Sequence, residues 1–171
     1  MQKLNLFPDD ILSQARGAAK CIDGVKNTDP FSHSTDDICH TNCGQSSPWL
    51  ALEFPGPVRV TKVDIYNRGD ECRWCAERTK NLEVRVTDEL PTSEDEMYTG
   101  GQLLGTFAGP GTPGQIIKVE GPARTGRYVL IQMNSRDCLN LHEVETFGGV
   151  DIDTECKEAQ QPDVEVNRYR I

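Results

Sequence analysis

The sequence predicts an all-β domain, most simply a β-sandwich or jelly roll with short loops and little helix. Several short segments alternate apolar and polar residues with a period of two, as half-buried strands do. The 15 glycines and 10 prolines gather between these segments, where turns are expected. Almost no segment carries a helical apolar stripe. Many short strands joined by Gly- and Pro-rich turns are typical of sandwiches and barrels.

The elements can be assigned in chain order. Residues 8–20 (PDDILSQARGAAK) could form a short helical turn, with Asp9 or Asp10 at its start. Residues 58–66 (VRVTKVDIY) give the clearest strand alternation, with valine, isoleucine and tyrosine set against polar neighbours. Further strands are predicted at 81–86, 115–121, 126–133 and 139–148, and turns at 53–57 (EFPGP), 108–114 (AGPGTPG) and 121–126 (GPARTG).

A chain of 171 residues is long enough for one domain with a proper core and short for two. We expect a domain over 1–150 and an acidic C-terminal tail or extension over 151–171, which is polar and lacks a core pattern. No apolar run approaches the roughly 20 residues of a membrane helix, so no membrane insertion is expected. Residues 1–14 lack the basic and apolar regions of a signal peptide, so a secreted form would begin as the mature domain.

The net charge of −9 argues against nucleic acid and anionic membrane surfaces as partners, because an acidic protein releases no counterions from either. It is compatible with a bound cation such as calcium. Enzyme signatures are poor: there are three histidines, no Gly-x-Ser-x-Gly elbow, no phosphate loop and no His-Glu-x-x-His. We therefore expect a protein that is not an enzyme.

Seven cysteines indicate zinc or redox chemistry in the cytosol, or disulfides outside the cell. Cys72 and Cys75 form the one compact pair, and no second pair stands at zinc-finger spacing. This favours a Cys72–Cys75 disulfide over zinc and a secreted, extracellular protein. The odd count leaves one cysteine over; Cys156 in the tail is the candidate, and it could link copies into an oligomer.

A basic and acidic cluster follows the clearest predicted strand. It consists of Arg68, Asp70 and Arg78 on a loop held by a rigid scaffold, a common place for a binding site. Three interpretations stand: an Arg-Gly-Asp tripeptide of the kind integrins read, a surface salt-bridge cluster, or a fork of donors for sugar hydroxyls, to which His40 would add a bond. On spacing alone the salt-bridge cluster is the simplest.

Five motifs along the chain, taken together, carry a family resemblance. They are CIDG at 21–24, ICHTNCGQSSPWLALEF at 38–54, VTKVDIYNRGDECRWCAER at 60–78, GRYVLIQ at 126–132 and LHEVETFG at 141–148. In this order they resemble the motifs of the F-type lectins, the fucose-binding family whose founding member is an eel agglutinin. The resemblance runs from about residue 5 to residue 148.

The resemblance implies a discoidin-like jelly-roll β-sandwich that binds L-fucose or fucosylated glycans and glycoproteins and holds a structural calcium ion. Arg68, Arg78 and His40 would contact the sugar, and Asp70 would orient the arginines. The calcium ion would be held by oxygens of Asp23 and Glu143, by backbone carbonyls, and by a further side-chain oxygen. The carbonyls would come from Lys20, Val25 and His142, and the further oxygen from Asp37.

The chain departs from the family signature at the pocket. His40 precedes Arg68 by 27 intervening residues where the signature has 26, and Thr41 stands at the ungapped position. Seven residues separate Asp70 from Arg78 instead of four. The family's adjacent cysteine pair, which packs against the apolar edge of the sugar, is replaced by Cys72-Arg73-Trp74-Cys75. Trp74 could stack on a sugar face or cap the pocket and exclude fucose.

The family's terminal cysteine is also replaced, by His142, so that Cys39 would pair with Cys43 or Cys138. Because of these departures a second function stands beside fucose binding. It is an F-type-like extracellular adhesion or protein-interaction domain that has lost or altered fucose binding.

Overall fold

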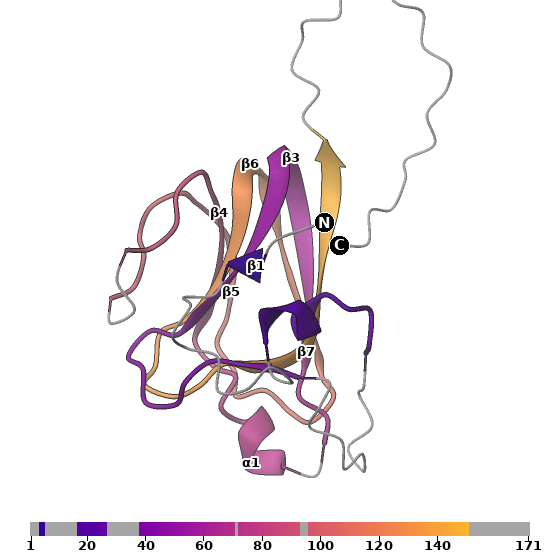
Figure 1. Cartoon of the computed structure of the whole chain (residues 1–171), viewed down its shortest axis with the longest axis vertical. Coiled ribbons are helices and arrows are strands. Elements are labelled where there is room, and N and C mark those ends of the chain that lie inside the picture. Colours follow the sequence, from indigo (N-terminus) through magenta and orange to yellow (C-terminus); the bar gives the residue numbers. More distant parts are fainter. Residues whose placement is uncertain (1–3, 6–16, 27–37, 71, 93–95, 151–171) are drawn as a thin grey trace, which may run out of the picture.

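The computed structural model describes residues 4–5, 17–26, 38–70, 72–92 and 96–150 (Figure 1). The region of the helical turn predicted at 8–20 is described only from residue 17, and the tail over 151–171 lies outside the described residues. The elements are β1 (Leu4–Asn5), the 3-10 helix η2 (Ala18–Cys21), β2 (Cys39–His40), β3 (Trp49–Asn67), α1 (Arg73–Ala76), β4 (Leu82–Thr87), β5 (Gln102–Phe107), β6 (Ile116–Met133) and β7 (Asn140–Val150). Strands dominate, and the predicted all-β class is confirmed.

All strand pairs are antiparallel, in the order β2-β7-β3-β6-β4-β5, and β1 pairs with β3. The long central strand β3 is hydrogen-bonded to β6 on one side and to β7 on the other. Figure 1 shows β3, β6 and β7 side by side, with α1 at the end of the domain opposite the tip of β7. In the part of the chain that the structure describes, no helix is long and apolar enough to cross a membrane.

The core forms between strand faces that follow the predicted period of two. Inward-facing residues of β3, β4, β6 and β7 are almost fully buried in alternating positions. They include Val63 and Ile65, Val84 and Val86, Ile117 and Val119, and Val129, Ile131 and Met133. At the end of β3 all residues from Val63 to Asn67 are buried, so the residues that follow β3 begin from a fixed point.

The turns predicted at 53–57 and 121–126 are wrong: these residues lie within β3 and β6. The pairing of β3 with β6 shifts register between Glu53 and Val58, and again between Val60 and Lys62. Pro55 and Pro57 fall in the first shift, where a missing N–H removes no ladder bond. The shifts therefore let two long strands bend where the sequence indicates breaks.

Three disulfides join cysteines among the described residues: Cys21–Cys39, Cys43–Cys138 and Cys72–Cys75. The predicted Cys72–Cys75 bond is confirmed. The expectation that Cys39 pairs with Cys43 or Cys138 is wrong, because η2 packs against β2 and β7 and brings Cys21 beside Cys39 in the core. Cys156 lies outside the described residues.

Candidate functional site

Arg68 and Asp70 form a buried ion pair directly after β3. The Arg68 Nε and Nη2 atoms donate to the two Asp70 carboxylate oxygens at 2.6 and 2.5 Å. The residues are only 8% and 5% exposed. The side chains of the Arg-Gly-Asp tripeptide thus face each other, which does not fit a tripeptide presented to an integrin. They form instead a planar donor group whose orientation is fixed by a carboxylate.

Asp70 keeps its charge despite this burial. Burial alone raises the pKa of the carboxyl group, but the hydrogen bonds and positive charge of Arg68 act in the opposite direction. The backbone N–H of Cys72, 3.2 Å from Oδ1, and the electrostatic contribution of His142 also lower the pKa. The net pKa lies below its ordinary value, so the group that orients Arg68 is a carboxylate.

Asn67, the last residue of β3, fixes α1 against the sheet. Its fully buried amide Nδ2 donates to the carbonyls of Ala76, at 3.1 Å, and Thr112, at 3.0 Å. The Thr79 hydroxyl donates to Asn67 Oδ1 at 2.7 Å. The Cys72–Cys75 disulfide closes the same short helix. The segment that replaces the adjacent cysteine pair of the resemblance is therefore firmly held.

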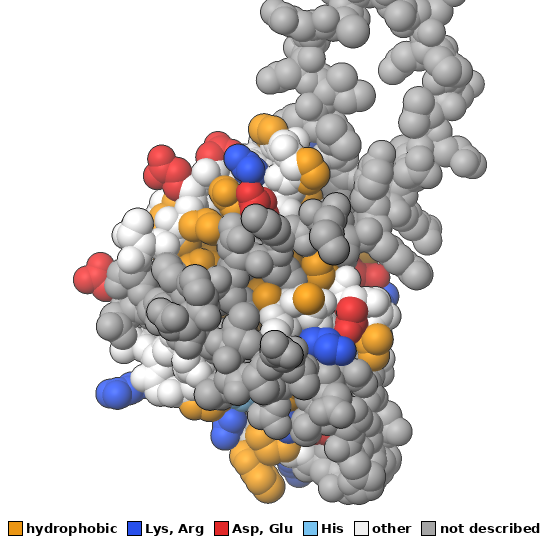
Figure 2. All heavy atoms as spheres, in the orientation of Figure 1, with side chains coloured by type: hydrophobic (Ala, Val, Ile, Leu, Met, Phe, Trp, Pro, Cys, Tyr) orange, Lys and Arg blue, Asp and Glu red, His pale blue; other side chains and the backbone are white. Residues whose placement is uncertain are grey.

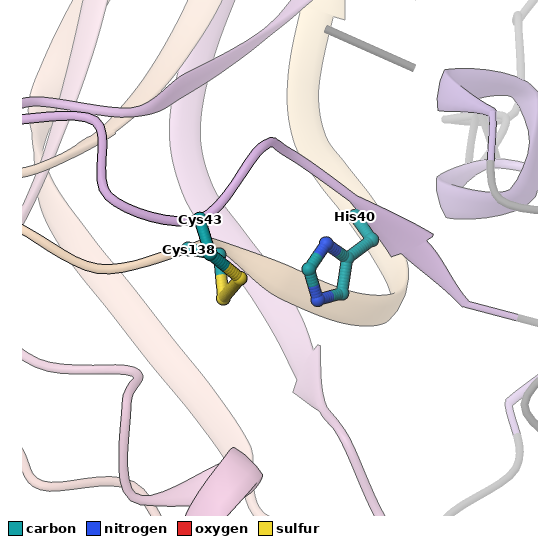
Figure 3. Close-up of side chains that lie close together, drawn as sticks. All are labelled: His40, Cys43 and Cys138. Carbon is teal, nitrogen blue, oxygen red and sulfur yellow. A yellow bond between two sulfur atoms is a disulfide. The ribbon is translucent and has the colours of Figure 1, made fainter. Parts of the chain in front are cut away.

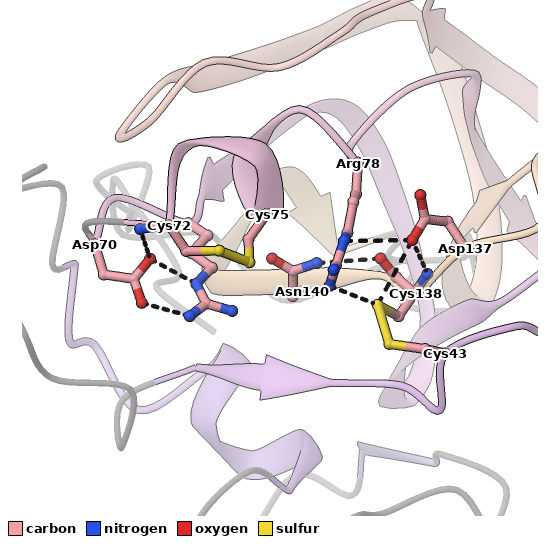
Figure 4. The surroundings of a disulfide bond; sticks show 9 residues. Cys43, Asp70, Cys72, Cys75, Arg78, Asp137, Cys138 and Asn140 are labelled. Carbon is pink, nitrogen blue, oxygen red and sulfur yellow. Dashed lines mark hydrogen bonds and ion pairs between the residues drawn. A yellow bond between two sulfur atoms is a disulfide. The ribbon is translucent and has the colours of Figure 1, made fainter.

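Arg78 enters the site from the far end of α1. Its Nη1 atom donates to the Cys138 sulfur at 3.1 Å, and its Nε lies 3.5 Å from an oxygen of Asp137. Figure 4 shows the Cys72–Cys75 disulfide between Asp70 and Arg78. The side chain of Arg78 is 29% exposed, so solvent reaches this guanidinium more than that of Arg68.

His40 approaches the Cys43–Cys138 disulfide from β2. A ring nitrogen of His40 and the sulfurs of Cys43 and Cys138 all lie within 4.8 Å of one another (Figure 3). The ring Nδ1 is 2.5 Å from the Thr41 carbonyl oxygen. His40 and Arg78 therefore both lie against the Cys43–Cys138 disulfide, despite the extra residue between His40 and Arg68. The Thr41 hydroxyl is engaged in the fold, because it accepts the N–H of Leu139 at 3.0 Å.

Zinc is not supported by this cluster. Cys43 and Cys138 are bonded to each other, and the other four described cysteines are also in disulfides. A disulfide sulfur is not the thiolate that binds zinc.

Trp74 does not cap the arginines. It is 67% exposed, whereas a ring closed over the site would be largely buried. Its neighbour Arg73 is also exposed and pairs with Glu77 at 3.3 Å on the surface of α1.

The residues implied in calcium binding meet where the loop after η2 reaches β7. The N–H of Gly24 donates to Glu143 at 2.9 Å, and Asp23 Oδ1 accepts the N–H of Val25 at 2.9 Å. Lys20 lies 3.6 Å from the other Asp23 oxygen, and His142 precedes Glu143 on β7 with no exposed surface. Asp37 lies outside the described residues.

The electrostatics of Glu143 fit a cation. The residue is 1% exposed, and burial is the main cause that raises the pKa of its carboxyl group to about 7. The negative charges of Asp23 and Glu145 raise it further, against the opposing effects of the Gly24 N–H and Lys26. A hard cation with oxygen ligands would relieve this crowding of negative charge around the buried Glu143 carboxylate.

Asp137 and Asn140 were not identified from the sequence. Asp137 pairs with Arg78, and the Asn140 amide donates to the Cys138 carbonyl at 3.1 Å. Asn140 is fully buried and pairs with His40 in the β2–β7 register. In the sequence they are distinguished only by their nearness to Cys138, and it is the fold that brings Cys138 against Arg78.

Comparison with known proteins identifies the family. The model of the NedA-like, galactose-binding domain matches residues 20–131, which is more than half of the chain. Fucolectin of Anguilla anguilla is 30% identical over 129 residues, which cover 75% of this chain and 74% of the eel protein. The chain belongs to the F-type lectin family. The family interpretation of the sequence motifs is confirmed.

Other relatives of this F-type lectin domain include the pentraxin fusion protein of Xenopus laevis, which is 28% identical over 142 residues. The match covers 82% of this chain and 31% of the Xenopus protein. The solved fucolectin from striped bass (Morone saxatilis) serum has a TM-score of 0.67 at 24% identity, covering 86% of this chain and 46% of that one. The lectin domain of lectinolysin in complex with the Lewis b antigen gives 0.61 at 22%, covering 88% and 93%. These structures confirm the discoidin-like β-sandwich.

Proposed function

We propose that this F-type lectin domain binds L-fucose or fucosylated glycans and glycoproteins at the site formed by Arg68, Arg78 and His40. The observation that carries the proposal is the buried bidentate pair of Arg68 and Asp70, together with Arg78 and His40, which both lie against the Cys43–Cys138 disulfide. Asp70 occupies one edge of the Arg68 guanidinium and leaves its other donors for the lone pairs of sugar hydroxyls. Because these groups are already ordered, binding costs less conformational entropy.

An apolar edge of the sugar would rest on the Cys72–Cys75 disulfide. This disulfide lies between Asp70 and Arg78 and closes the short helix α1 (Figure 4). A deoxy sugar has both a methyl group and hydroxyls, and it is complementary to a disulfide flanked by guanidinium donors. Relatives support the ligand class, since similar structures include a fucose-binding module of Streptococcus pneumoniae.

The proposal includes a structural calcium ion held by Asp23 and Glu143. Backbone carbonyls of Lys20, Val25 and His142, and the side chain of Asp37, would supply the remaining protein oxygens. When bound, the ion would neutralise the buried Glu143 carboxylate and the Asp23 carboxylate, and it would tie the loop after η2 to β7. Asp23 and Glu143 bring the charge, and Gly24 already links the two segments through its N–H.

We also infer that the domain works outside the cell and binds without catalysis. Three disulfides in the described residues form and persist in oxidising compartments. The relatives described above include lectins, one of them from serum.

Titration calorimetry with L-fucose, and with D-mannose as control, tests the proposal. Arg78 is the residue to replace, because Asp137, its partner, is itself 26% exposed and is not left as a buried charge. Arg78→Ala should weaken fucose binding by about 10- to 100-fold, the effect of losing hydrogen bonds from a charged donor. The matched control is Arg73→Ala, which removes an exposed arginine of α1 and should leave the binding of L-fucose alone unchanged.

Absence of binding to any fucosylated glycan on an array would refute the proposal. Capture of a protein partner that free fucose does not compete would then favour the adhesion or interaction function.

A further inference from the structure

Trp74 is an exposed aromatic side chain beside the proposed fucose site. At 67% it is the most exposed large apolar residue in the described part of the chain. The other exposed large apolar residues are between 37% and 43% exposed and lie outside α1; they are Val25, Leu103 and Ile116. Figure 2 shows hydrophobic atoms flanked by basic ones projecting at the end of the domain where Figure 1 places α1.

The exposure of Trp74 comes from a rigid element. Its neighbour Cys75 is 6% exposed and bonded to Cys72, and Ala76 is fully buried with its carbonyl held by Asn67. The backbone on both sides of Trp74 is therefore anchored while its ring faces solvent. A rigid aromatic ring offers contact area at low entropic cost, as in binding sites for polar ligands.

The surroundings of Trp74 match one sugar ring better than a protein surface. A stable protein interface buries on the order of 1,000 Å² or more, far beyond one indole ring. Arg73 and Glu77 flank the ring with side chains that are 81% and 48% exposed. Their mutual pair is of the weak surface kind, so each can turn to a hydroxyl. An apolar ring with polar groups at its edge complements a pyranose, which has C–H groups on a face and hydroxyls around it.

α1 also carries this ring next to the disulfide of the proposed fucose site. The Cys72 N–H at the start of the helix donates to Asp70, and the Arg78 N–H after its end donates to the Cys75 carbonyl. A sugar held by the arginines would therefore lie against the Cys72–Cys75 disulfide. A residue linked to that sugar and leaving the site over α1 would meet Trp74.

We propose that Trp74, with Arg73 and Glu77, forms a second subsite for the pyranose that carries the fucose. The ligand class is then a fucosylated oligosaccharide whose second ring presents a C–H face, as a β-galactoside does. This inference rests on the proposed fucose site. It gives that site a preference for disaccharides over the single sugar.

Binding of methyl α-L-fucoside and of fucosyl-α1,2-galactose should be compared by calorimetry. Wild type should bind the disaccharide about 3- to 10-fold more tightly, the effect of one aromatic stacking contact. Trp74→Ala should bring the ratio to about one and leave the methyl fucoside affinity unchanged. Trp74→Phe should keep part of the ratio. Folding is not at risk, because the replaced ring is mostly exposed.

Tryptophan fluorescence gives a second readout. The chain has two tryptophans, and Trp49 is 5% exposed, so acrylamide quenches mainly Trp74. The disaccharide should protect Trp74 from acrylamide, and methyl fucoside should protect it much less. If methyl fucoside binds but the disaccharide is no tighter and gives no protection, this inference is overturned and the fucose site stands. If neither ligand binds, both fail.

Discussion

Replacing Arg68 by alanine should destabilise the domain by about 3–5 kcal/mol. The magnitude follows from burial: Asp70 is 5% exposed, and Arg68 supplies both of its ion-pair hydrogen bonds, at 2.6 and 2.5 Å. Without Arg68 the carboxylate keeps the 3.2 Å bond from the Cys72 N–H and is left as a buried, uncompensated charge. Removing one partner of a buried pair has a cost of this size, whereas losing a surface pair costs less than about 1 kcal/mol.

The assay is equilibrium denaturation in urea under non-reducing conditions, followed by circular dichroism. Arg68→Ala should lower the midpoint with little change in the slope, which reports the surface exposed on unfolding. Arg73→Ala is the matched control. Its partner Glu77 lies on the surface, and the expected change is below about 0.5 kcal/mol.

The double variant Arg68→Ala/Asp70→Ala makes the test sharper. It removes the stranded carboxylate, so it should be more stable than Arg68→Ala alone. If Arg68→Ala lowers the free energy of unfolding by less than about 1 kcal/mol, or if adding Asp70→Ala lowers it by as much again, Arg68 and Asp70 are not coupled as described. Asp70 would then not be the group that orients Arg68.

Three further outcomes follow from the structure. The pKa of Asp70 in the folded state lies below its ordinary value of 3.8, so its stabilising contribution is present above pH 3.8 and is lost as the pH falls through the lower folded value. In Asp70→Asn the free energy of unfolding should therefore fall less steeply at acid pH. Calcium should raise the Tm by several degrees above the value measured in EDTA, and Glu143→Gln should remove most of this increase. An equal increase in the variant would contradict the proposed ligand set. Replacing Cys43 and Cys138, which are 95 residues apart, by serine should lower the free energy of unfolding by about 5 kcal/mol, and the same change at Cys72 and Cys75 by about 2 kcal/mol, because the longer loop restricts the unfolded chain more. Equal losses in denaturant unfolding would refute this explanation.

The sequence predicted local features well where local chemistry decides them. The alternation over 58–66 comes from a strand with one face in the core, and β3 includes it. Arg68 and Asp70 are two residues apart and pair with each other, and Cys72 and Cys75 close one helical turn. These features depend on neighbours in the chain.

The features that sequence reasoning missed depend on distant segments. Pro55 and Pro57 indicate a turn, but the register shift opposite β6 lets the strand continue. Cys39 pairs with Cys21 because η2 docks on β2 and β7, and no local pattern indicates that docking. Asp137 lies beside Arg78 because the fold brings its neighbour Cys138 against the Arg78 side chain.

A crystal structure with L-fucose bound tests the central claim most directly. We predict that the sugar lies against the Cys72–Cys75 disulfide, with hydroxyls within hydrogen-bond distance of Arg68, Arg78 and His40. A sugar bound at another place in the domain, or a site that stays empty at saturating fucose, would contradict it.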